Sequence, residues 1–245
     1  MRALIGSSGF IGGFLASRGE FSALYRRSNI DQMRGGRFTE IICAGMPAQK
    51  WLANREPEAD LANLKALTDV LETVSADRFI LISTIDVFSA EQTGIEGGPR
   101  SAEHAYGRHR AMLEDFVATH FREHHVVRLP AMFGPGLRKN AVFDLLHDNQ
   151  LEKISPRSMF QWYDLRWLEG DLAEIVRDGV REANLFTPPV SMGAIQGMFF
   201  PDRVLGKDAP CITYSHVTSR SSTGFVRTTA EVMSALGAFV AEAAT

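Results

Sequence analysis

Three glycines near the amino terminus have the spacing of a turn that binds phosphate. Gly6, Gly9 and Gly12 follow a short apolar run, Ala3–Ile5, and precede or open a predicted helix over Ile11–Arg18. Glycines permit a tight turn, and the start of a helix presents free N–H groups and the positive end of its dipole. A strand before the glycines and a helix after them is the context of a dinucleotide fingerprint. The residues predicted to contact the pyrophosphate are Gly6, Ser8, Gly9, Phe10, Ile11 and Gly12.

The end of the second predicted strand, Phe21–Tyr25, carries cations where an acid would favour NAD. An Asp or Glu at this point binds the adenosine ribose hydroxyls of NAD. This chain has Arg26, Arg27 and Ser28 instead. Two guanidinium groups and a hydroxyl suit a 2′-phosphate, so NADP is favoured, with NAD as the other possibility. A solvated loop with two surface arginines is the structural alternative.

Two hydroxyl side chains are candidates for proton transfer. Thr84 comes directly after a predicted strand, Phe79–Ser83, and Tyr106 lies near the start of a predicted helix, Ala102–Phe121. Arg110 is one turn further on the same helix face. A cation beside a phenol stabilises the phenolate, so we expect Arg110 to lower the pKa of Tyr106. Tyr106 would then exchange a proton with a carbonyl/alcohol pair while Thr84 holds its oxygen. Each residue taken alone is more often a packed helix tyrosine or a strand-end threonine.

The order of these motifs resembles a known superfamily. The glycine motif is followed by Ser-Thr-x-x-Val-Phe over Ser83–Phe88, by Tyr-x-x-x-basic over Tyr106–Arg110, and by Arg-x-Pro…Phe-Gly-Pro-Gly over Arg128–Gly136. The chain is similar to the extended short-chain dehydrogenase/reductases, and within them to the NAD-dependent epimerase/dehydratase group. Its Ser-Thr-x-x-Val-Phe stretch is most like the dTDP-4-dehydrorhamnose reductases. The resemblance covers about residues 1–140.

The resemblance implies a Rossmann domain, a nicotinamide cofactor and a nucleotide-linked sugar as substrate. It assigns the carbonyl-orienting hydroxyl to Thr84 and the acid/base to Tyr106. The family has a lysine four residues after the tyrosine, where this chain has Arg110. A compact ammonium and a planar guanidinium are not interchangeable in binding the nicotinamide ribose. A reductase or an epimerase is therefore the leading hypothesis, and a non-catalytic NADP-binding sensor or partner-binding protein is the alternative. A dehydratase is a weaker one, supported only by Asp86.

Other residues complete the predicted site. Those expected at the cofactor besides the glycine motif and the arginines are Ala44, Ser83, Tyr106 and Arg110. Those expected at the substrate are Asp86, Phe133, Gln161 and Trp162, although the aromatic stretch around Trp162 is more typical of a core. No metal site is expected. The cluster of His120, His124 and His125 is interpreted as a solvated helix end, and His109 as a surface residue.

These residues need strands and helices in alternation to position them. Further predicted strands lie at Glu40–Ala44 and Val126–Leu129, and a predicted helix over Ala59–Ser75 has Leu61, Leu64, Leu67, Leu71 and Val74 at helical spacing. This rhythm predicts an α/β fold with a doubly wound parallel sheet of the Rossmann type over residues 1–135. The rhythm ends after Gly134-Pro135-Gly136. Residues 136–245 are predicted to form a small mixed substrate-binding region packed on the sheet.

Composition excludes several other classes. The 245 residues are 45% hydrophobic and 22% charged, which is typical of a globular protein. A net charge of -3 offers no basic field for nucleic acid, and no run approaches the length of a membrane span. Two cysteines, Cys43 and Cys211, cannot form a disulfide framework and suit a cytoplasmic location. A homodimer through the two long helices is expected from the resemblance alone.

Overall fold

The computed structural model describes residues 1–89 and 91–243, which form two compact units. Unit 1 consists of residues 1–89, 97–128 and 169–183, and unit 2 consists of residues 91–96, 129–168 and 184–243. The predicted boundary at residue 135 stays a prediction.

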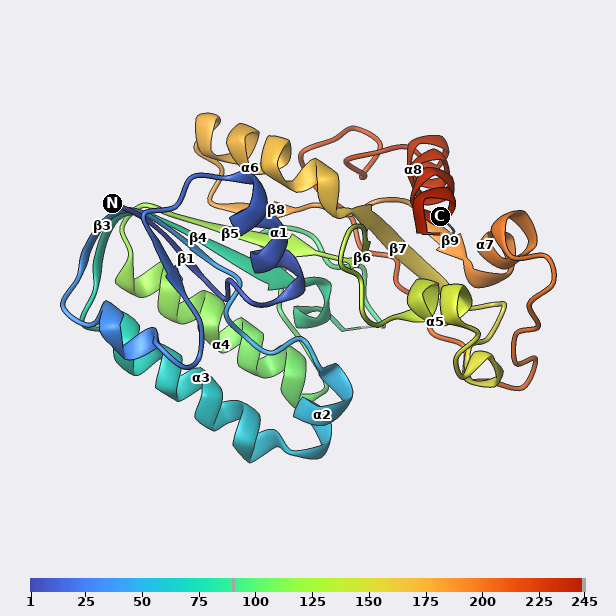
Figure 1. Ribbon diagram of the computed structural model, residues 1–245, viewed down its shortest axis with the longest axis horizontal. Helices are drawn as coiled ribbons and strands as arrows, with labels where there is room; N and C mark the ends of the chain where they lie inside the picture. The colour runs from blue at the N-terminus through green and yellow to red at the C-terminus, as the bar shows by residue number, and fades with distance from the viewer. Residues whose placement is uncertain (90, 244–245) are drawn as a thin grey trace. The chain divides into compact units, whose positions relative to one another are not determined.

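A six-stranded parallel sheet forms the frame of unit 1, in the order β2-β1-β3-β4-β5-β8 (Figure 1). Its strands are β1 (Arg2–Ile5), β2 (Ala23–Tyr25), β3 (Arg37–Cys43), β4 (Ser75–Thr84), β5 (His124–Leu129) and β8 (Glu182–Asn184). Ile5 at the end of β1 is paired with Tyr25 on one side and Cys43 on the other. The loops after these three strands therefore leave the same edge of the sheet, where α/β proteins bind ligands. The predicted Rossmann-type fold is confirmed.

Helices cover both faces of this sheet. They are α1 (Phe10–Arg18), α2 (Lys50–Arg55), α3 (Pro57–Leu71), α4 (Ala105–His120) and α6 (Leu168–Arg177). In Figure 1, α3 and α4 lie side by side on one face, and α1 and α6 lie on the other, joined by an ion pair between Arg18 and Glu169. The order of β2, β1 and β3 makes the chain change direction across the sheet between β1 and β3, which places successive crossovers on opposite faces.

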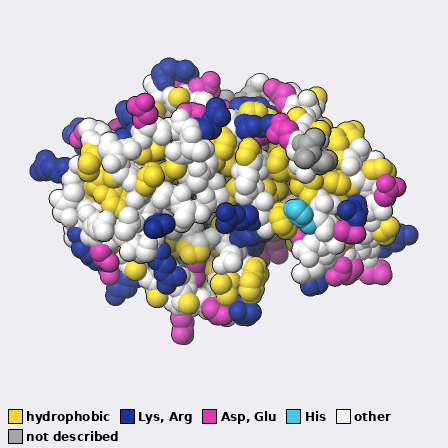
Figure 2. Space-filling view, in the orientation of Figure 1, with side chains coloured by type: hydrophobic (Ala, Val, Ile, Leu, Met, Phe, Trp, Pro, Cys, Tyr) yellow, Lys and Arg dark blue, Asp and Glu magenta, His cyan; other side chains and the backbone are white. Residues whose placement is uncertain are grey.

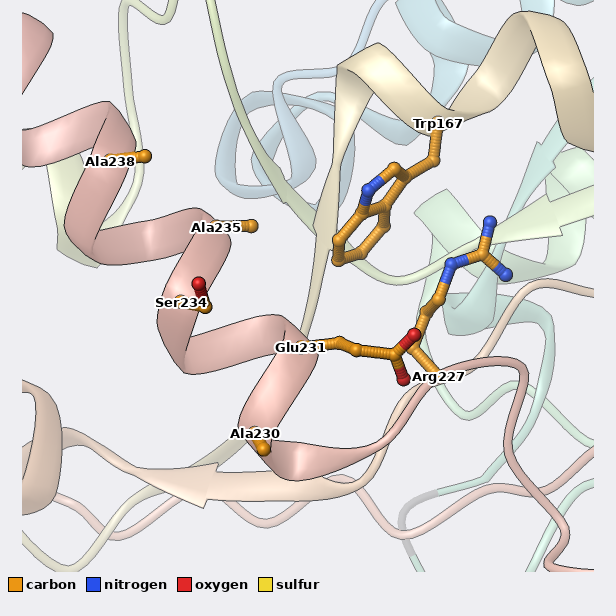
Figure 3. Close-up of a pocket in the computed structure, with 7 residues that line it drawn as sticks. All are labelled: Trp167, Arg227, Ala230, Glu231, Ser234, Ala235 and Ala238. Carbon is orange, nitrogen blue, oxygen red and sulfur yellow. The ribbon is translucent and has the colours of Figure 1, made fainter.

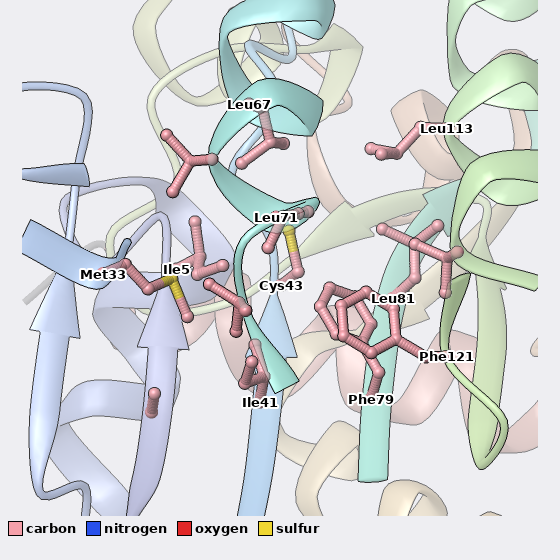
Figure 4. Close-up of a cluster of buried hydrophobic side chains, with 14 of the residues drawn as sticks. Ile5, Met33, Ile41, Cys43, Leu67, Leu71, Phe79, Leu81, Leu113 and Phe121 are labelled. Carbon is pink, nitrogen blue, oxygen red and sulfur yellow. The ribbon is translucent and has the colours of Figure 1, made fainter. Parts of the chain in front are cut away.

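The core of unit 1 lies between the sheet and the pair α3 and α4. Figure 4 shows Ile41, Phe79 and Leu81 from the strands facing Leu71 and Leu113 from the helices. The predicted apolar face of the first long helix is correct for Leu64, Leu67 and Leu71, whereas Leu61 is 41% exposed and Val74 follows the end of α3. Cys43 is enclosed in this core, and burial raises its pKa to about 11, whereas Cys211 is exposed.

Unit 2 contains a mixed three-stranded sheet with helices packed on it. The sheet order is β6-β7-β9, with β6 (Ala131–Phe133) and β7 (Met159–Asp164) parallel and β9 (Pro189–Ser191) antiparallel to β7. The helices are α5 (Ala141–His147), α7 (Met192–Phe199) and α8 (Thr229–Ala243). The aromatic stretch seen in the sequence is β7. The core of the unit includes Phe133, Trp162, Val190, Leu236 and Phe239.

The visible surface shows no concentration of one charge. On the face in Figure 2, Lys and Arg side chains lie in several separate groups, with Asp and Glu among them. In the part of the chain that the structure describes, no helix is long and apolar enough to cross a membrane.

Candidate functional site

The glycine turn after β1 is required by close backbone packing. Gly6 has a φ of 89°, and a Cβ at this position would collide with the carbonyl oxygen of Ala44, just after β3. A Cβ on Gly12 would collide with the carbonyl oxygen of Gly6. The first glycine therefore lets the loops after β1 and β3 meet, and the third lets α1 pack against the turn.

The start of α1 is open to an anion. Gly9 is its N-cap residue, no side chain in the described part of the chain caps the helix, and the first turn contains no acidic residue. The first N–H groups of a helix have no partner inside it, and the dipole adds positive potential there. The geometry therefore fits a pyrophosphate at this turn.

The loop after β2 is attached to the glycine turn. The N–H groups of Gly6 and Ser7 both donate to the carbonyl oxygen of Tyr25, over 2.8 and 3.1 Å. Arg26 Nε donates to Ser28 Oγ at 3.1 Å, and Arg26 and Arg27 are exposed. Among residues 1–89 and 91–243, no ion pair with a carboxylate involves either arginine. Both guanidinium groups are thus available for a phosphate next to the turn.

Thr84 and Tyr106 are brought together by the close approach of two elements. The short 3-10 helix η2 (Ile85–Val87) follows Thr84, and a Cβ on Gly107 would collide with the carbonyl oxygen of Asp86 in η2. The first turn of α4 therefore lies directly against η2, close enough for the Thr84 side chain to lower the pKa of the Tyr106 phenol. The Asn54 side chain accepts the Tyr106 backbone N–H at 3.0 Å, which holds this helix start in place.

Arg110 has the expected effect on the pKa of Tyr106, but burial outweighs it. The Arg110 guanidinium does lie 4.0 Å from the centre of the Tyr106 ring, and its charge lowers the pKa of the phenol. Burial has the larger effect, however, and raises the pKa of Tyr106 to about 12, with Asp86 and Asp60 adding to the rise. Arg110 is also paired with Asp60 and donates to the carbonyl oxygen of Pro47. Its charge is thus compensated, and it faces the ring rather than the hydroxyl.

Two charged residues beside the hydroxyl pair were not predicted to interact. The Lys50 ammonium lies 2.6 Å from Asp86 Oδ1, and the Thr84 hydroxyl donates to Asp86 Oδ2 at 3.3 Å. His104 Nε2 lies 3.8 Å from the same carboxylate. Lys50 is the first residue of α2, a helix that the sequence did not reveal because it has only six residues. In the sequence, the only indication of this cluster was that Asp86 lies two positions after Thr84.

Ser83 faces the interior of unit 1. Its hydroxyl donates to Glu114 Oε1 at 2.5 Å, and the Glu114 carboxylate is also bound by Arg128 at 2.7 Å and by Arg100 at 3.2 Å. The Ser83 side chain therefore anchors β4 to α4. The predicted role of Ser83 at the cofactor stays a prediction. Because its hydroxyl is bound to Glu114, a cofactor contact would have to come from the Ser83 backbone or from a neighbouring group.

Three histidines were misplaced by the sequence interpretation. His109 is buried, with Nδ1 2.7 Å from Asp60 Oδ2, and is not on the surface. His124 and His125 are buried in β5, where their Nδ1 atoms pair with the carbonyl oxygens of Phe121 and Val180. They do not form a solvated helix end, because α4 stops at His120 and all six residues of β5 are buried.

The predicted substrate residues of unit 2 lie in its core. The Gln161 amide nitrogen donates to the carbonyl oxygens of Thr187 and His216, and its oxygen accepts the His216 N–H. Both amide protons are therefore used internally. Trp162 is 1% exposed, and Phe133 packs against Phe239 at 5.8 Å between ring centres. This burial favours structural roles, and their roles at a substrate stay predictions.

Unit 2 also has a pocket that the sequence did not indicate. It measures about 530 Å³ and lies along α8. Figure 3 shows the Trp167 ring and the Arg227 side chain facing the small residues of this helix, with Glu231 directed at Arg227. The Arg227 guanidinium lies 5.0 Å from the centre of the Trp167 ring. The pocket residues are Trp167, Arg227, Ala230, Glu231, Ser234, Ala235 and Ala238.

The parallel sheet and the glycine turn define a Rossmann-type α/β protein. No protein-family model and no curated protein sequence matches the chain significantly. Solved structures do. TunA, an NAD-dependent NDP-hexosamine 5,6-dehydratase involved in tunicamycin biosynthesis, is 16% identical, with 98% of each chain covered and a TM-score of 0.78. A dTDP-4-dehydrorhamnose reductase from Yersinia enterocolitica is 14% identical, with 98% of each chain covered and a TM-score of 0.74. RMD from Pseudomonas aeruginosa, complexed with NADPH, is 14% identical over 99% of this chain and 98% of that chain, with a TM-score of 0.69.

These similarities establish the fold that the chain shares with nucleotide-sugar enzymes. The resemblance of the sequence to dTDP-4-dehydrorhamnose reductases is confirmed at that level, over nearly the whole chain rather than its first 140 residues alone.

Proposed function

We propose that the protein is an NADP-dependent oxidoreductase that acts on a nucleotide-linked sugar. The observation that supports this most is the close approach of α4 to η2, which brings Tyr106 next to Thr84 at the end of β4, in the sheet whose β1 leads into the glycine turn. Some of the similar structures are complexes with NAD, NADP or NADPH, and three contain a UDP-sugar.

The residues around the turn fit a dinucleotide cofactor. The glycine turn and the first N–H groups of α1 would hold the pyrophosphate, and Arg26, Arg27 and Ser28 would hold a 2′-phosphate. Ala44 follows β3 at the same edge, where the backbone meets Gly6. When bound, the cofactor supplies a hydride from C4 of its nicotinamide.

Tyr106 is suited to donating a proton. With a pKa raised to about 12, its phenol is protonated at neutral pH and gives its proton to a carbonyl oxygen as that oxygen gains charge. Thr84 would orient the same oxygen through its hydroxyl. The reduction needs the protonated phenol, which is the form present at neutral pH, whereas the oxidation step of an epimerase needs the phenolate, which burial makes harder to form.

Arg110 is proposed as a positioning residue. Its bonds to Asp60 and to the Pro47 carbonyl fix the guanidinium over the Tyr106 ring. Asp60 and the Pro47 carbonyl therefore already bind the Arg110 guanidinium, which is the group that would have to bind the nicotinamide ribose in place of the family's lysine. That occupation is the specific observation in favour of the alternative, a protein that binds NADP without turnover.

The decisive experiment measures binding and turnover separately. We expect NADPH to bind more tightly than NADH by fluorescence titration, and Arg26→Ala and Arg27→Ala to remove that preference. Arg122→Ala is the matched control, because Arg122 is exposed and follows α4 near the opposite edge of the sheet. NADPH oxidation with a panel of keto-sugar nucleotides should fall by at least about a hundredfold in Tyr106→Phe.

Each outcome has a clear meaning. Tight NADPH binding without turnover on any substrate would favour the non-catalytic alternative. Unchanged turnover in Tyr106→Phe would refute the proposed mechanism, and equal affinity for the two cofactors would remove the role given to the arginines. The homodimer and the cytoplasmic location stay predictions.

A further inference from the structure

The helix that carries Tyr106 begins at an unusual capping residue. His104 is the N-cap of α4, in an extended backbone conformation, and its Nδ1 accepts the Gly107 backbone N–H at 3.1 Å. The usual capping side chains are Ser, Thr, Asp and Asn, whose oxygen atoms accept at neutral and at mildly acidic pH. An imidazole accepts only through a ring nitrogen that carries no proton. The cap of α4 therefore depends on the protonation state of His104.

This cap acts on the turn that positions Tyr106. The Tyr106 N–H donates to the Asn54 side chain at 3.0 Å, and the next N–H, that of Gly107, donates to His104. The Gly107 backbone lies against the Asp86 carbonyl oxygen, which a Cβ on Gly107 would meet. The capped N–H groups thus belong to Tyr106 itself and to the glycine by which α4 approaches η2. Loss of the His104 cap frees the Gly107 end of this turn.

The bond to Gly107 fixes the tautomer of the neutral imidazole. A backbone N–H can only donate, so Nδ1 of His104 is the acceptor and the single ring proton is on Nε2. A second proton can enter only at Nδ1, where it would face the N–H group that Nδ1 now binds. It would also place a positive charge at the positive end of the helix dipole. Protonation of His104 and capping of α4 therefore exclude each other.

The groups around His104 favour its neutral form. Burial and the Lys50 ammonium on α2 lower the pKa of His104 below its ordinary value of 6.5. The Asp86 carboxylate on η2, with Oδ1 3.8 Å from Nε2, acts in the opposite direction without reversing the shift, and Arg108 on α4 adds to the lowering. The remaining titratable neighbour is the Tyr106 ring, centred 6.3 Å away. His104 is therefore neutral at neutral pH and becomes charged only below pH 6.5.

We propose that His104 is a positioning residue whose neutral imidazole caps α4 and holds the turn that carries Tyr106, and that protonation of Nδ1 releases this turn. The start of α4 thereby responds to pH in a way that an Asn or Ser cap would not. The part of His104 in a reduction rests on the proposed function, whereas the cap and its loss on protonation do not.

The test measures the exchange of the Gly107 amide proton with solvent, without cofactor or substrate. NMR on the full chain gives the protection factor, relative to an unstructured peptide at the same pH. We expect the Gly107 N–H to be protected in the wild type at neutral pH. His104→Ala removes the acceptor and should lower this protection by about fivefold or more. Circular dichroism confirms that each variant is folded.

His104→Asn separates the acceptor from the titration. The Asn side-chain oxygen caps a helix and is not protonated in this range, so this variant should keep Gly107 protected from neutral pH down to about pH 5. In the wild type, protection should fall together with the titration of the His104 ring, which NMR follows and the variant assigns. His120→Asn makes the same change at the exposed last residue of α4. This matched control should leave the wild-type response unchanged.

The inference and the proposed function fail in different ways. Equal protection in the wild type and His104→Ala, loss of protection in His104→Asn, or wild-type protection that does not follow the imidazole would each overturn the inference, whatever the turnover is. If no variant oxidises NADPH, the proposed function fails on its own, and the protection factors of Tyr106 and Gly107 still decide the inference.

Turnover adds a readout that a merely structural cap would not change. Where the protein oxidises NADPH, the wild-type kcat should fall by about tenfold per pH unit below the pKa of His104. This acid limb should be absent in His104→Asn, and the dissociation constant of NADPH should be the same in both proteins. A wild-type kcat that stays constant while the Gly107 cap is lost would overturn the positioning role.

Discussion

The two units differ in what they enclose. Unit 1 encloses ionised side chains as pairs, namely Asp60 with Arg110 and Glu114 with Arg128. The buried hydrogen bonds of unit 2 mainly link neutral groups. An example is the bond from the Gln161 amide nitrogen to the Thr187 carbonyl oxygen. Enclosed charges are costly unless they are paired. The difference agrees with the placement of the proposed site in unit 1.

The ion pair of Asp164 with Arg166 in unit 2 shows most clearly how the two units differ. Asp164 is buried and bound by Arg166 at 2.7 Å, but the Arg166 side chain is 33% exposed and also reaches Glu242 on the surface. Water can therefore compensate one member of this pair. In unit 1, the Arg128 and Glu114 side chains are both 2% exposed, so water has little access to either member of their ion pair.

The largest effect is expected from Glu114→Gln. Loss of the carboxylate removes the enclosed partner of the Arg128 guanidinium, which should lower the free energy of unfolding by about 3–5 kcal/mol. Asp164→Asn in unit 2 should cost less, because Arg166 can be hydrated. Urea unfolding followed by circular dichroism measures both variants. Equal losses would remove the distinction between the two units.

The next effect is a loss of stability at alkaline pH. The pKa of Tyr106 is raised from its ordinary value of 10 to about 12, so its contribution is complete below pH 10 and is lost as the pH rises toward 12. Two pKa units correspond to about 3 kcal/mol. Tyr106→Phe should therefore lose less stability than the wild type between pH 9 and 11. Parallel pH profiles for the two proteins would contradict the enclosure of this phenol.

A smaller effect is expected in the interior of unit 2. Gln161→Ala leaves the carbonyl oxygens of Thr187 and His216 and the His216 N–H without their partner, which should cost about 1–3 kcal/mol. Gln92→Ala, at an exposed position of the same unit, is the control and should be neutral. A cost as large as that of Glu114→Gln would show that neutral networks matter as much as enclosed charges here.

The smallest effect is expected at the surface of unit 1. Arg18 and Glu169 join α1 to α6 at 3.3 Å, and both side chains are more than half exposed. A double-mutant cycle of Arg18→Ala and Glu169→Ala should give a coupling below about 1 kcal/mol, which salt removes. A coupling that persists in high salt would mean that exposure is not what separates strong from weak pairs in this unit.

The alternation of strands and helices over residues 1–135 was predictable, apart from the short helix α2, because the signals are local. The glycine spacing requires a close turn, and leucines at helical spacing predict the face of α3 that meets the sheet. The cluster of chemical residues at one edge then follows from parallel strands. In unit 2 the strands β6 and β9 have three residues each, too few for a periodic pattern, so the sequence indicated only a mixed region.

The sequence alone determined the glycine turn and the cations after β2, and it suggested the pairing of Thr84 with Tyr106 by analogy. It could not determine how charges compensate one another. Asp60, the partner of Arg110, lies 50 residues away in the chain. Asp86, the partner of Lys50, lies 36 residues away. Burial depends on the whole fold, and for Tyr106 burial outweighs the nearby cation. Only the tertiary structure therefore decided that the pKa of this phenol is raised rather than lowered.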